Sequence, residues 1–367
     1  MSSLALRRIR LRAGLVVLVT AVAVVGGTIG RSGAAVIAPT PNPAFTLKSV
    51  DQKCFYAARP AGGWPFLPQT RIRPIRGGFN DVRTPVHDGV DIEAPSDHAP
   101  VYAIDAGTIA NETAPNRPNG GTHLDVIDAP GHSYTYWHII WPSALVDGAH
   151  VKRGQLLGHI DYTFWHVHIS ETVTGCGLVD PRRPTGLLHD PANTESPAIG
   201  PLAAFGADGA AYSFTLGATS DPSTPLPLGA LSGIVDLRAA VTDTPHDATR
   251  RFVQLPLSPA AIRGYLAPAA SPNSHLGPIS VYDGSQFILN TYGGVLGYQK
   301  VWAFGTKWSN TCFFTPGTTC AANYTYHTAG AGFDTRLVPD GAYQWCVQAL
   351  TIGGVSARRC TAVTIAN

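Results

Sequence analysis

Charged side chains are scarce in this sequence. Only 14% of its 367 residues are Asp, Glu, Lys or Arg, and the formal net charge is +2. A nucleic-acid partner is therefore not expected, because proteins that bind nucleic acid usually carry a basic face or stripe. Long amphipathic helices are also missing, since no stretch repeats its apolar residues with a period of 3.6. The 30 prolines and 39 glycines favour short strands and turns instead, which predicts a globular, mainly β protein.

Cysteine pairs of the kind that bind zinc are absent, because none of the six cysteines forms a Cys-x-x-Cys motif. Such cysteines suit an oxidising compartment, where they form disulfides. The expected pairs are Cys346–Cys360, Cys312–Cys320 and Cys54–Cys176. The first pair flanks Gly353–Gly354, as the two sides of a hairpin would, and the second brackets a short turn. The third pair follows mostly by elimination.

The first 35 residues have the composition of a targeting segment. A basic stretch from Arg7 to Arg12 is followed by an apolar run from Ala13 to Val25, and small residues come next. This order is typical of a secretory signal peptide. An uncleaved N-terminal anchor is the alternative, but the apolar run is shorter than the ~20 residues of a spanning helix. Either interpretation predicts that the rest of the chain is exported, with membrane contact only through an uncleaved segment.

The remaining sequence divides into two expected domains of about 150 residues each. A Pro-rich linker over residues 36–50 leads into a histidine-rich domain over 51–190, where short alternating runs are separated by turns. Closely spaced strands without intervening helices predict an antiparallel sheet. Residues 191–230, rich in Ala, Pro, Ser and Gly, are interpreted as a second linker. Residues 231–367 contain an alternating strand and a terminal hairpin, which predict an immunoglobulin-like β-sandwich module.

Ten of the 13 histidines lie between His87 and His189. Two motifs in this region have the residue types of a zinc site, His87-Asp88-Gly89-Val90-Asp91 and His166-Val167-His168. Each motif alone is weak evidence, but both occur in one small domain with His138 between them, which predicts a metalloenzyme. The other histidines of the region are interpreted as surface or loop residues: His98, His123, His132, His150, His159 and His189.

The spacing inside each motif restricts how it could bind a metal. In a straight strand His87 and Asp91 would lie about 13 Å apart at ~3.3 Å per residue, too far to share one ion. The segment must therefore bend, and Gly89 permits the bend. His166 and His168 are two residues apart, so on a strand they point to the same face. Both could bind the metal, or one could bind while the other contacts the reacting water; the spacing leaves this open.

Taken in order, the motifs resemble those of the lysostaphin/LytM-type zinc metallopeptidases. The resemblance covers roughly residues 75–172 and rests on six segments: Gly78–Arg83, His87–Ile92, Pro100–Ala103 with Gly107, Tyr136–Ile139, Val151–Gly158 and His166–Ile169. It implies a compact antiparallel β peptidase domain with an open groove. It also implies that this domain holds one zinc ion and cleaves peptide bonds of bacterial peptidoglycan.

The resemblance assigns a role to each residue of the cluster. His87, Asp91 and His168 would hold the zinc, which leaves a fourth position open for water. His166 would be the general base, and His138 would assist it or stabilise the oxyanion.

One segment departs from the family pattern. The approach to the second motif, Gly158–Trp165, carries bulky aromatic residues where the family has a Gly-rich stretch. This difference bears on the choice of substrate more than on metal binding. Four aromatic residues near the motifs are interpreted either as walls of a substrate groove or as core: Trp137, Trp141, Phe164 and Trp165.

The sequence thus predicts an exported, monomeric zinc endopeptidase that acts on peptidoglycan peptides and is secreted or associated with the cell wall. One alternative is a non-catalytic regulator with a peptidase-like domain, although regulators typically lose metal ligands and this chain keeps all five expected residues. Another is a cell-wall binding protein in which the C-terminal module binds. The sequence does not decide which peptide bond is cut or whether residues 36–75 form an inhibitory segment. Asn80 is a conceivable latch that would bind the zinc in such an inhibited form.

Overall fold

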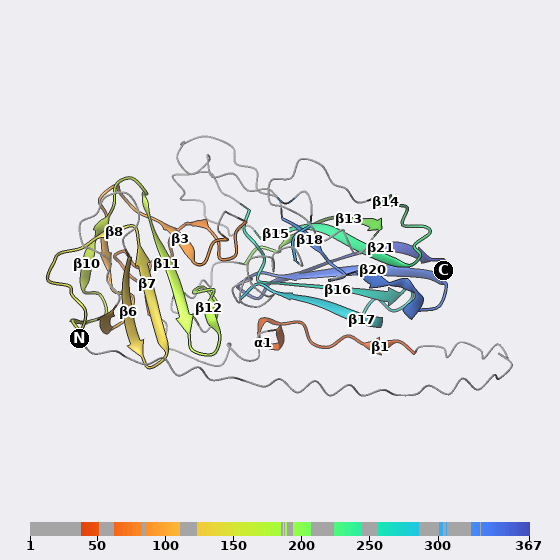
Figure 1. The fold of residues 1–367 in the computed structure, drawn as a ribbon, viewed down its shortest axis with the longest axis horizontal. Helices are drawn as coiled ribbons and strands as arrows, with labels where there is room; N and C mark the ends of the chain where they lie inside the picture. Colours follow the sequence, from red (N-terminus) through yellow and green to blue (C-terminus); the bar gives the residue numbers. More distant parts are fainter. Residues whose placement is uncertain are drawn as a thin grey trace, which may run out of the picture. The chain divides into compact units, whose positions relative to one another are not determined.

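Strands dominate the protein (Figure 1), which confirms the predicted mainly β fold class. The structure is a computed structural model that describes residues 38–50, 62–82, 86–110, 123–184, 186, 188, 194–206, 224–243, 256–285, 301–303, 306, 324–330 and 332–367. The predicted targeting segment lies outside these residues. Within the described ranges, no helix has the length and apolar character needed to cross a membrane. Residues 37–367 form one compact unit by the clustering of their contacts. The division of this unit into two domains stays a prediction.

The histidine-rich region forms one large and one small antiparallel sheet. The large sheet has the order β2 (Ile75–Gly77), β3 (Val90–Glu93), β11 (His166–Val173), β7 (His132–Trp137), β6 (His123–Ala129), β5 (Gly107–Ala110) and β9 (His150–Val151), and β12 (Gly177–Val179) also pairs with β11. The small sheet consists of β4 (Pro100–Tyr102), β10 (Leu156–Ile160) and β8 (Ile139–Ile140). Buried and half-buried residues alternate along β7, as the sequence pattern predicts for a strand with one face in the core.

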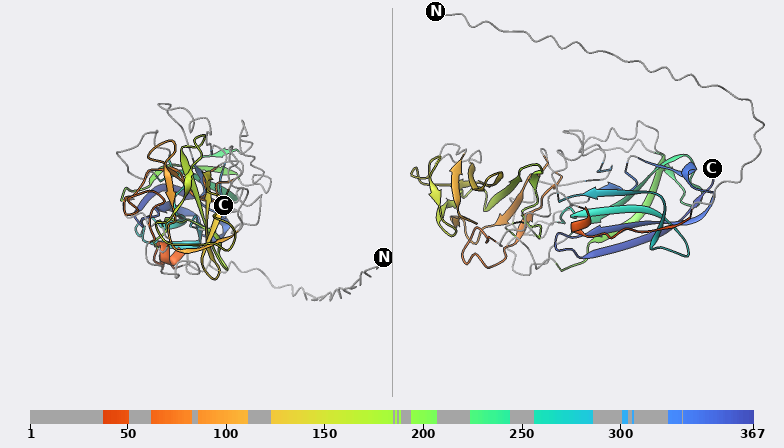
Figure 2. Two further views of the ribbon diagram at one scale, coloured as in Figure 1. Left: turned by 90° about the vertical axis from the view of Figure 1, so that its left-hand side faces the viewer. Right: turned by 90° about the horizontal axis from the view of Figure 1, so that it is seen from below.

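The C-terminal region forms two further sheets, and Figure 2 shows their long strands from two other sides. One sheet has the order β1 (Thr40–Pro41), β17 (Ser274–Asp283), β16 (Ala261–Pro268), β20 (Gly341–Leu350) and β21 (Ser356–Ile365). The other contains β14 (Pro225–Leu226), β13 (Ala198–Gly206), β15 (Ile234–Thr242) and β18 (Thr325–His327), with β19 (Phe333–Asp334) on β15. The immunoglobulin-like assignment of this region stays a prediction.

The predicted terminal hairpin is confirmed together with its disulfide. Cys346 of β20 lies directly opposite Cys360 of β21 in the register, and their sulfur atoms are 2.02 Å apart. Cys176 is also disulfide-bonded. Its expected partner Cys54 lies outside the described residues, as do Cys312 and Cys320.

Both segments expected to be linkers contribute strands to the C-terminal sheets, so these interpretations were wrong. Within residues 36–50, β1 pairs with β17, and Leu47 of α1 (Leu47–Val50) is buried in an apolar cluster with Ala260 and Leu350. Within residues 191–230, β13 pairs with β15 over most of its length. The sequence signal failed because β1 is a two-residue edge strand that tolerates proline. In β13 only Ala204 is buried, so no alternating apolar pattern marks this strand.

A buried polar network fixes the strand that carries the second histidine motif. His132, expected at the surface, is only 6% exposed and contacts Asp128 (Nδ1 to Oδ1, 2.5 Å) and Glu171 (Nε2 to Oε1, 2.7 Å). Glu171 of β11 also accepts two hydrogen bonds from the buried guanidinium of Arg183, at 2.8 and 2.9 Å. The network ties β7 to β11. His98, His150 and His159 are exposed as expected, and His189 lies outside the described residues.

Replacing Glu171 by Gln should destabilise the protein by about 3 kcal/mol, because the buried guanidinium of Arg183 loses its anionic partner. Denaturant unfolding followed by fluorescence measures the change. Asp334→Asn is the matched control, because it removes the carboxylate of an ion pair with the exposed Arg336 and should leave the unfolding midpoint where it is. Equal midpoints for Glu171→Gln and wild type would contradict the structural role of the network.

Candidate metal centre

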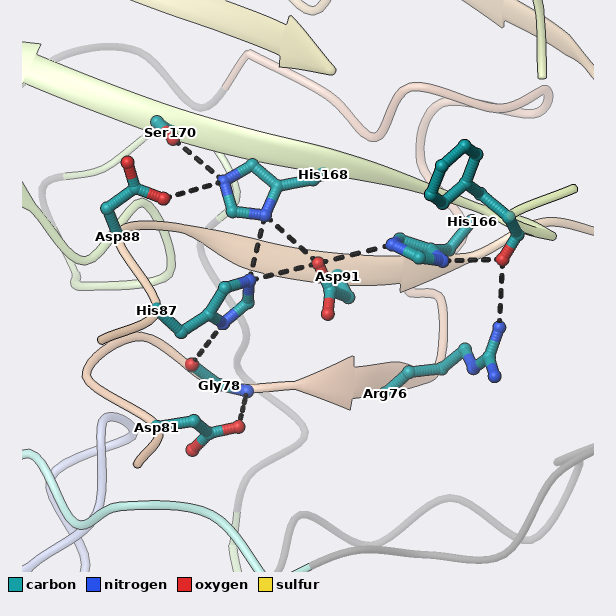
Figure 3. Close-up of polar contacts among 10 residues, drawn as sticks. Arg76, Gly78, Asp81, His87, Asp88, Asp91, His166, His168 and Ser170 are labelled. Carbon is teal, nitrogen blue, oxygen red and sulfur yellow. Dashed lines mark hydrogen bonds and ion pairs between the residues drawn. The ribbon is translucent and has the colours of Figure 1, made fainter. Parts of the chain in front are cut away.

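Three potential metal ligands meet where β3 pairs with β11 (Figure 3). His168 of β11 lies directly opposite Asp91 of β3 in the register, and His87 reaches the same point from the bend before β3. The Nε2 atom of His87 is 2.8 Å from Nδ1 of His168, and each of these nitrogens is 3.0 Å from Oδ1 of Asp91. All three residues are buried. The structure thus brings together the three residues predicted as zinc ligands.

The bend predicted between His87 and Asp91 is present, since β3 begins only at Val90. A glycine is needed at position 89 mainly because the backbone there lies very close to β11. A Cβ atom at this position would lie 2.4 Å from the carbonyl oxygen of Ile169 and 2.6 Å from Nε2 of His168. The absence of a side chain therefore lets the bend lie directly against β11.

Hydrogen-bond acceptors fix which nitrogen of each ring carries the proton. Nδ1 of His87 lies 2.6 Å from the carbonyl oxygen of Gly78, and Nε2 of His168 lies 3.2 Å from the carboxylate of Asp88. Carbonyl and carboxylate oxygens only accept, so these nitrogens donate. In the neutral rings, the lone pairs of His87 Nε2 and His168 Nδ1 therefore both point at Oδ1 of Asp91. A second acceptor on the far nitrogen is the usual arrangement of metal-binding histidines.

This donor set fits a divalent cation such as zinc. Three converging lone pairs, one of them on a carboxylate, repel one another unless positive charge lies between them. Burial opposes protonation of His168, but hydrogen bonds to Asp88 and Asp91 outweigh it and raise the pKa of this imidazole. The surroundings therefore favour positive charge at this point. Donors of a tetrahedral zinc lie about 3.3–3.6 Å apart, slightly farther than the spacings here.

His166 lies beside the three donors on the same face of β11, as its spacing from His168 predicts. Its Nδ1 is 2.6 Å from the carbonyl oxygen of Phe164, which also accepts from Arg76. Nδ1 therefore donates, and the lone pair on Nε2 faces Oδ1 of Asp91 at 3.4 Å. In the neutral tautomer with its proton on Nδ1, His166 presents the lone pair of Nε2 to the centre.

His138 completes the cluster from the joint between β7 and β8, where its φ of 65° lies in the left-handed region. Its ring stacks on Phe164 with a centroid distance of 4.0 Å and lies 4.9 Å from the ring of His166. Burial first, and then the neighbouring imidazoles of His166 and His168, keep the pKa of His138 well below its ordinary value, so the ring is neutral. Its Nδ1 is buried without a hydrogen-bond partner.

Several groups around the cluster escaped the sequence analysis. Asp88 and Ser170 both contact Nε2 of His168, at 3.2 and 2.9 Å, and the backbone carbonyl of Gly78 orients His87. Ser170 could have been found, because it is two residues beyond His168 and so shares its face of the strand. Asp88 lies in an irregular bend, and a backbone carbonyl has no side-chain signature.

The aromatic residues divide between core and site. Trp141 is only 1% exposed and belongs to the core. Phe164 lies against His138, and the ring of Trp137 is edge-on to His168 at a centroid distance of 6.4 Å. Trp165 is half-buried and has a φ of 55°. Of the aromatic residues before the second motif, Phe164 therefore packs directly against a histidine of the cluster.

The turn that carries Gly78 is held by the C-terminal region. The hydroxyl of Tyr324 donates to Oδ1 of Asp81 at 2.8 Å, and Oδ2 of Asp81 accepts from the backbone N–H of Gly78 at 2.5 Å. Asn80, with a φ of 59°, donates from Nδ2 to the carbonyl oxygen of Gly284 at 3.1 Å. These contacts position the carbonyl group of Gly78, which accepts a hydrogen bond from the ring of His87. A latch role of Asn80 stays a prediction.

Substituting Gly89 by Ala should weaken zinc binding about tenfold or more, because the added methyl group displaces His168 or the backbone of β11. Titration of the purified, metal-free protein with zinc measures the dissociation constant. Gly206→Ala is the matched control, since a Cβ there meets nothing within 4 Å. Wild-type affinity in the Gly89 variant would show that the close approach does not position His168.

Comparisons with known proteins find no matching protein-family profile and no matching curated protein. Solved structures with similar parts include the catalytic domain of the antimicrobial peptidase lysostaphin from Staphylococcus simulans. The likeness has 26% identity and a TM-score of 0.25, and it covers 30% of this chain and 89% of that one. The SpoIIQ–SpoIIIAH pore-forming complex matches with 21% identity and a TM-score of 0.27, over 33% of this chain and 87% of that one.

A structure described as a peptidase M23 from Pseudomonas aeruginosa matches with 23% identity and a TM-score of 0.23, over 33% of this chain. The match covers 52% of the Pseudomonas chain, and a match to a Helicobacter pylori protein covers 30% of that protein. Each likeness is therefore confined to part of this chain. Because the TM-scores lie below 0.5, the function of this protein has to be argued from the site itself.

Proposed function

We propose that the protein is an exported zinc-dependent endopeptidase that hydrolyses peptide bonds of bacterial peptidoglycan. One observation carries this proposal: the lone pairs of His87 and His168 converge with a carboxylate oxygen of Asp91 at 2.8–3.0 Å. Three protein ligands and an open position are the composition of catalytic zinc sites, whereas structural sites are closed by four protein ligands. Export is supported by the basic and apolar segment before Val25, and the substrate by the motif resemblance.

The bound zinc would lower the pKa of a water molecule towards ~7 and polarise the carbonyl group of the substrate. We propose His166 as the general base; in the neutral ring its Nε2 lone pair would face the centre while Nδ1 donates to the carbonyl of Phe164. It takes a proton at Nε2 and returns it to the nitrogen of the leaving amine. The fixed tautomer makes this nitrogen available without a ring flip.

We propose that His138 stabilises the developing oxyanion. Its neutral ring stacks on Phe164 beside His166, and its buried Nδ1 lacks a hydrogen-bond partner. An N–H of this neutral ring would donate to the negatively charged substrate oxygen and stabilise it in the transition state. The stacked Phe164 fixes the plane of the ring. Phe164 therefore acts as a positioning residue for His138.

The proposed roles of His168 as a zinc ligand and of His166 as the general base predict different effects of alanine substitution on zinc content and hydrolysis. His168→Ala should lose both stoichiometric zinc and hydrolysis. His166→Ala should keep one zinc per chain but lose hydrolysis by about 10²–10⁴-fold, because only the proton transfer is removed. Zinc is measured by atomic emission on dialysed protein, and hydrolysis by the release of new amino termini from purified sacculi. His150→Ala, which changes an exposed histidine on β9, is the control and should match wild type.

The same measurements separate the proposed enzyme from the two other functions that the sequence allows. Wild-type protein that leaves sacculi intact, whether or not it holds zinc, and does not sediment with them would point to a non-catalytic regulator. Protein that holds no stoichiometric zinc and still sediments with sacculi would point to a cell-wall binding protein. Either result contradicts the proposal. Mass spectrometry of the new amino termini identifies the bond that is cut.

A further inference from the structure

A cavity of about 280 Å³ is lined by Glu93, two residues along β3 from the candidate ligand Asp91. Its lining includes Arg71, Arg73, Glu93 and Ala94. Glu93 of β3 pairs with His166 in the register and is two residues from Asp91, so its side chain shares the face that carries the metal ligands. The backbone N–H of Ala94 donates to the carbonyl of Trp165, next to His166, at 3.1 Å. The cavity is therefore continuous with the strands that build the site.

Neither arginine side chain of this cavity has a hydrogen bond or ion pair to a carboxylate among the described residues. Arg73 is only 7% exposed, yet its Nε is buried without a hydrogen-bond partner, and the hydrogen bond of its guanidinium runs to the backbone carbonyl of Leu67. Arg71 is exposed, and within the described residues no hydrogen bond or ion pair is found for its guanidinium, although its backbone N–H donates to the carbonyl of Pro68. Burial first, and then the charge of Arg71, lower the pKa of Arg73. Buried cationic groups are normally paired, so this one has the character of a ligand-binding group.

We infer that this arginine pocket, formed by Arg71 and Arg73 with the wall at Glu93, binds a carboxylate of the peptide that is cleaved at the neighbouring centre. This inference rests on the proposed endopeptidase function. A guanidinium presents a planar fork of donors that matches a carboxylate with two parallel hydrogen bonds. Two guanidinium groups against one carboxylate of Glu93 leave one net positive charge. That balance suits a single carboxylate and disfavours a polyanion.

The pocket also explains how a substrate could be aligned. A carboxylate held by Arg71 and Arg73 anchors the peptide near Glu93, the register partner of His166, so that the bond to be cut extends across the face of β3 and β11 towards His168. Such an anchor on a non-reacting part of the substrate supplies binding and orientation. It predicts a preference for peptides with an acidic group at a fixed distance from the cleaved bond.

The test uses soluble peptides released from peptidoglycan by a muramidase, either untreated or with every carboxylate converted to a primary amide of nearly the same size. Binding to the full chain is measured by isothermal titration calorimetry in a His166→Ala background, which prevents cleavage. We expect amidation to weaken binding about tenfold. Arg71→Gln should weaken binding of untreated peptides by a similar factor and leave binding of amidated peptides unchanged. Arg73→Lys, which keeps the charge but loses the fork, should show an intermediate loss.

Lys152→Gln is the matched control, because it removes one positive charge from an exposed side chain elsewhere and should leave binding unchanged. Equal affinity for untreated and amidated peptides would overturn the arginine pocket, as would equal losses in the Arg71 and Lys152 variants. Hydrolysis of sacculi by protein with wild-type His166 is a separate readout. Carboxylate-dependent binding without hydrolysis would uphold the pocket and contradict the proposed enzyme, whereas hydrolysis without carboxylate dependence would do the reverse.

Discussion

The pairing of β3 with β11 is the constraint on which the candidate site depends. Its register sets Asp91 opposite His168 and Glu93 opposite His166, so that one pair of strands carries two expected ligands, the expected base and a wall of the arginine pocket. A slip of one residue would turn each of these side chains to the other face of the sheet. The buried residues Val90, Ile92 and Val167 on the same strands oppose such a slip, because it would exchange them with the polar side chains of the opposite face and place those in the apolar core.

Contacts from outside this strand pair hold the register and the rings. Glu171, on the same strand as His168, is fixed by His132 and Arg183. The turn at Gly78, which orients His87, is tied through Asp81 to Tyr324 in the C-terminal region. The C-terminal sheets therefore contribute to the order of the metal centre, in addition to any binding role of their own. Hydrogen bonds from these more distant residues fix the orientation and the tautomers of the histidine rings.

The sequence predicted the parts of this account that depend on local periodicity. Alternation identified β6, β7 and β15, and the spacing of His166 and His168 placed both on one face. The bend at Gly89 followed from the distance between two ligands of one motif, although its reason, the close approach to Ile169, required the structure. The burial of His132 and the strand β13 could not be predicted, since both depend on partners distant in sequence. The same holds for Asp88 and for Arg73, whose significance lies in which neighbours they have or lack.

The central claim is that His87, Asp91 and His168 hold one metal ion through particular atoms. Anomalous diffraction from crystals of the zinc-loaded protein at the zinc absorption edge tests it most directly. The account predicts a single peak at about 2.0–2.2 Å from Nε2 of His87, Oδ1 of Asp91 and Nδ1 of His168, with His166 outside bonding distance. A peak bonded to Nε2 of His168 or to His166, or the absence of a peak at these residues, would contradict the account.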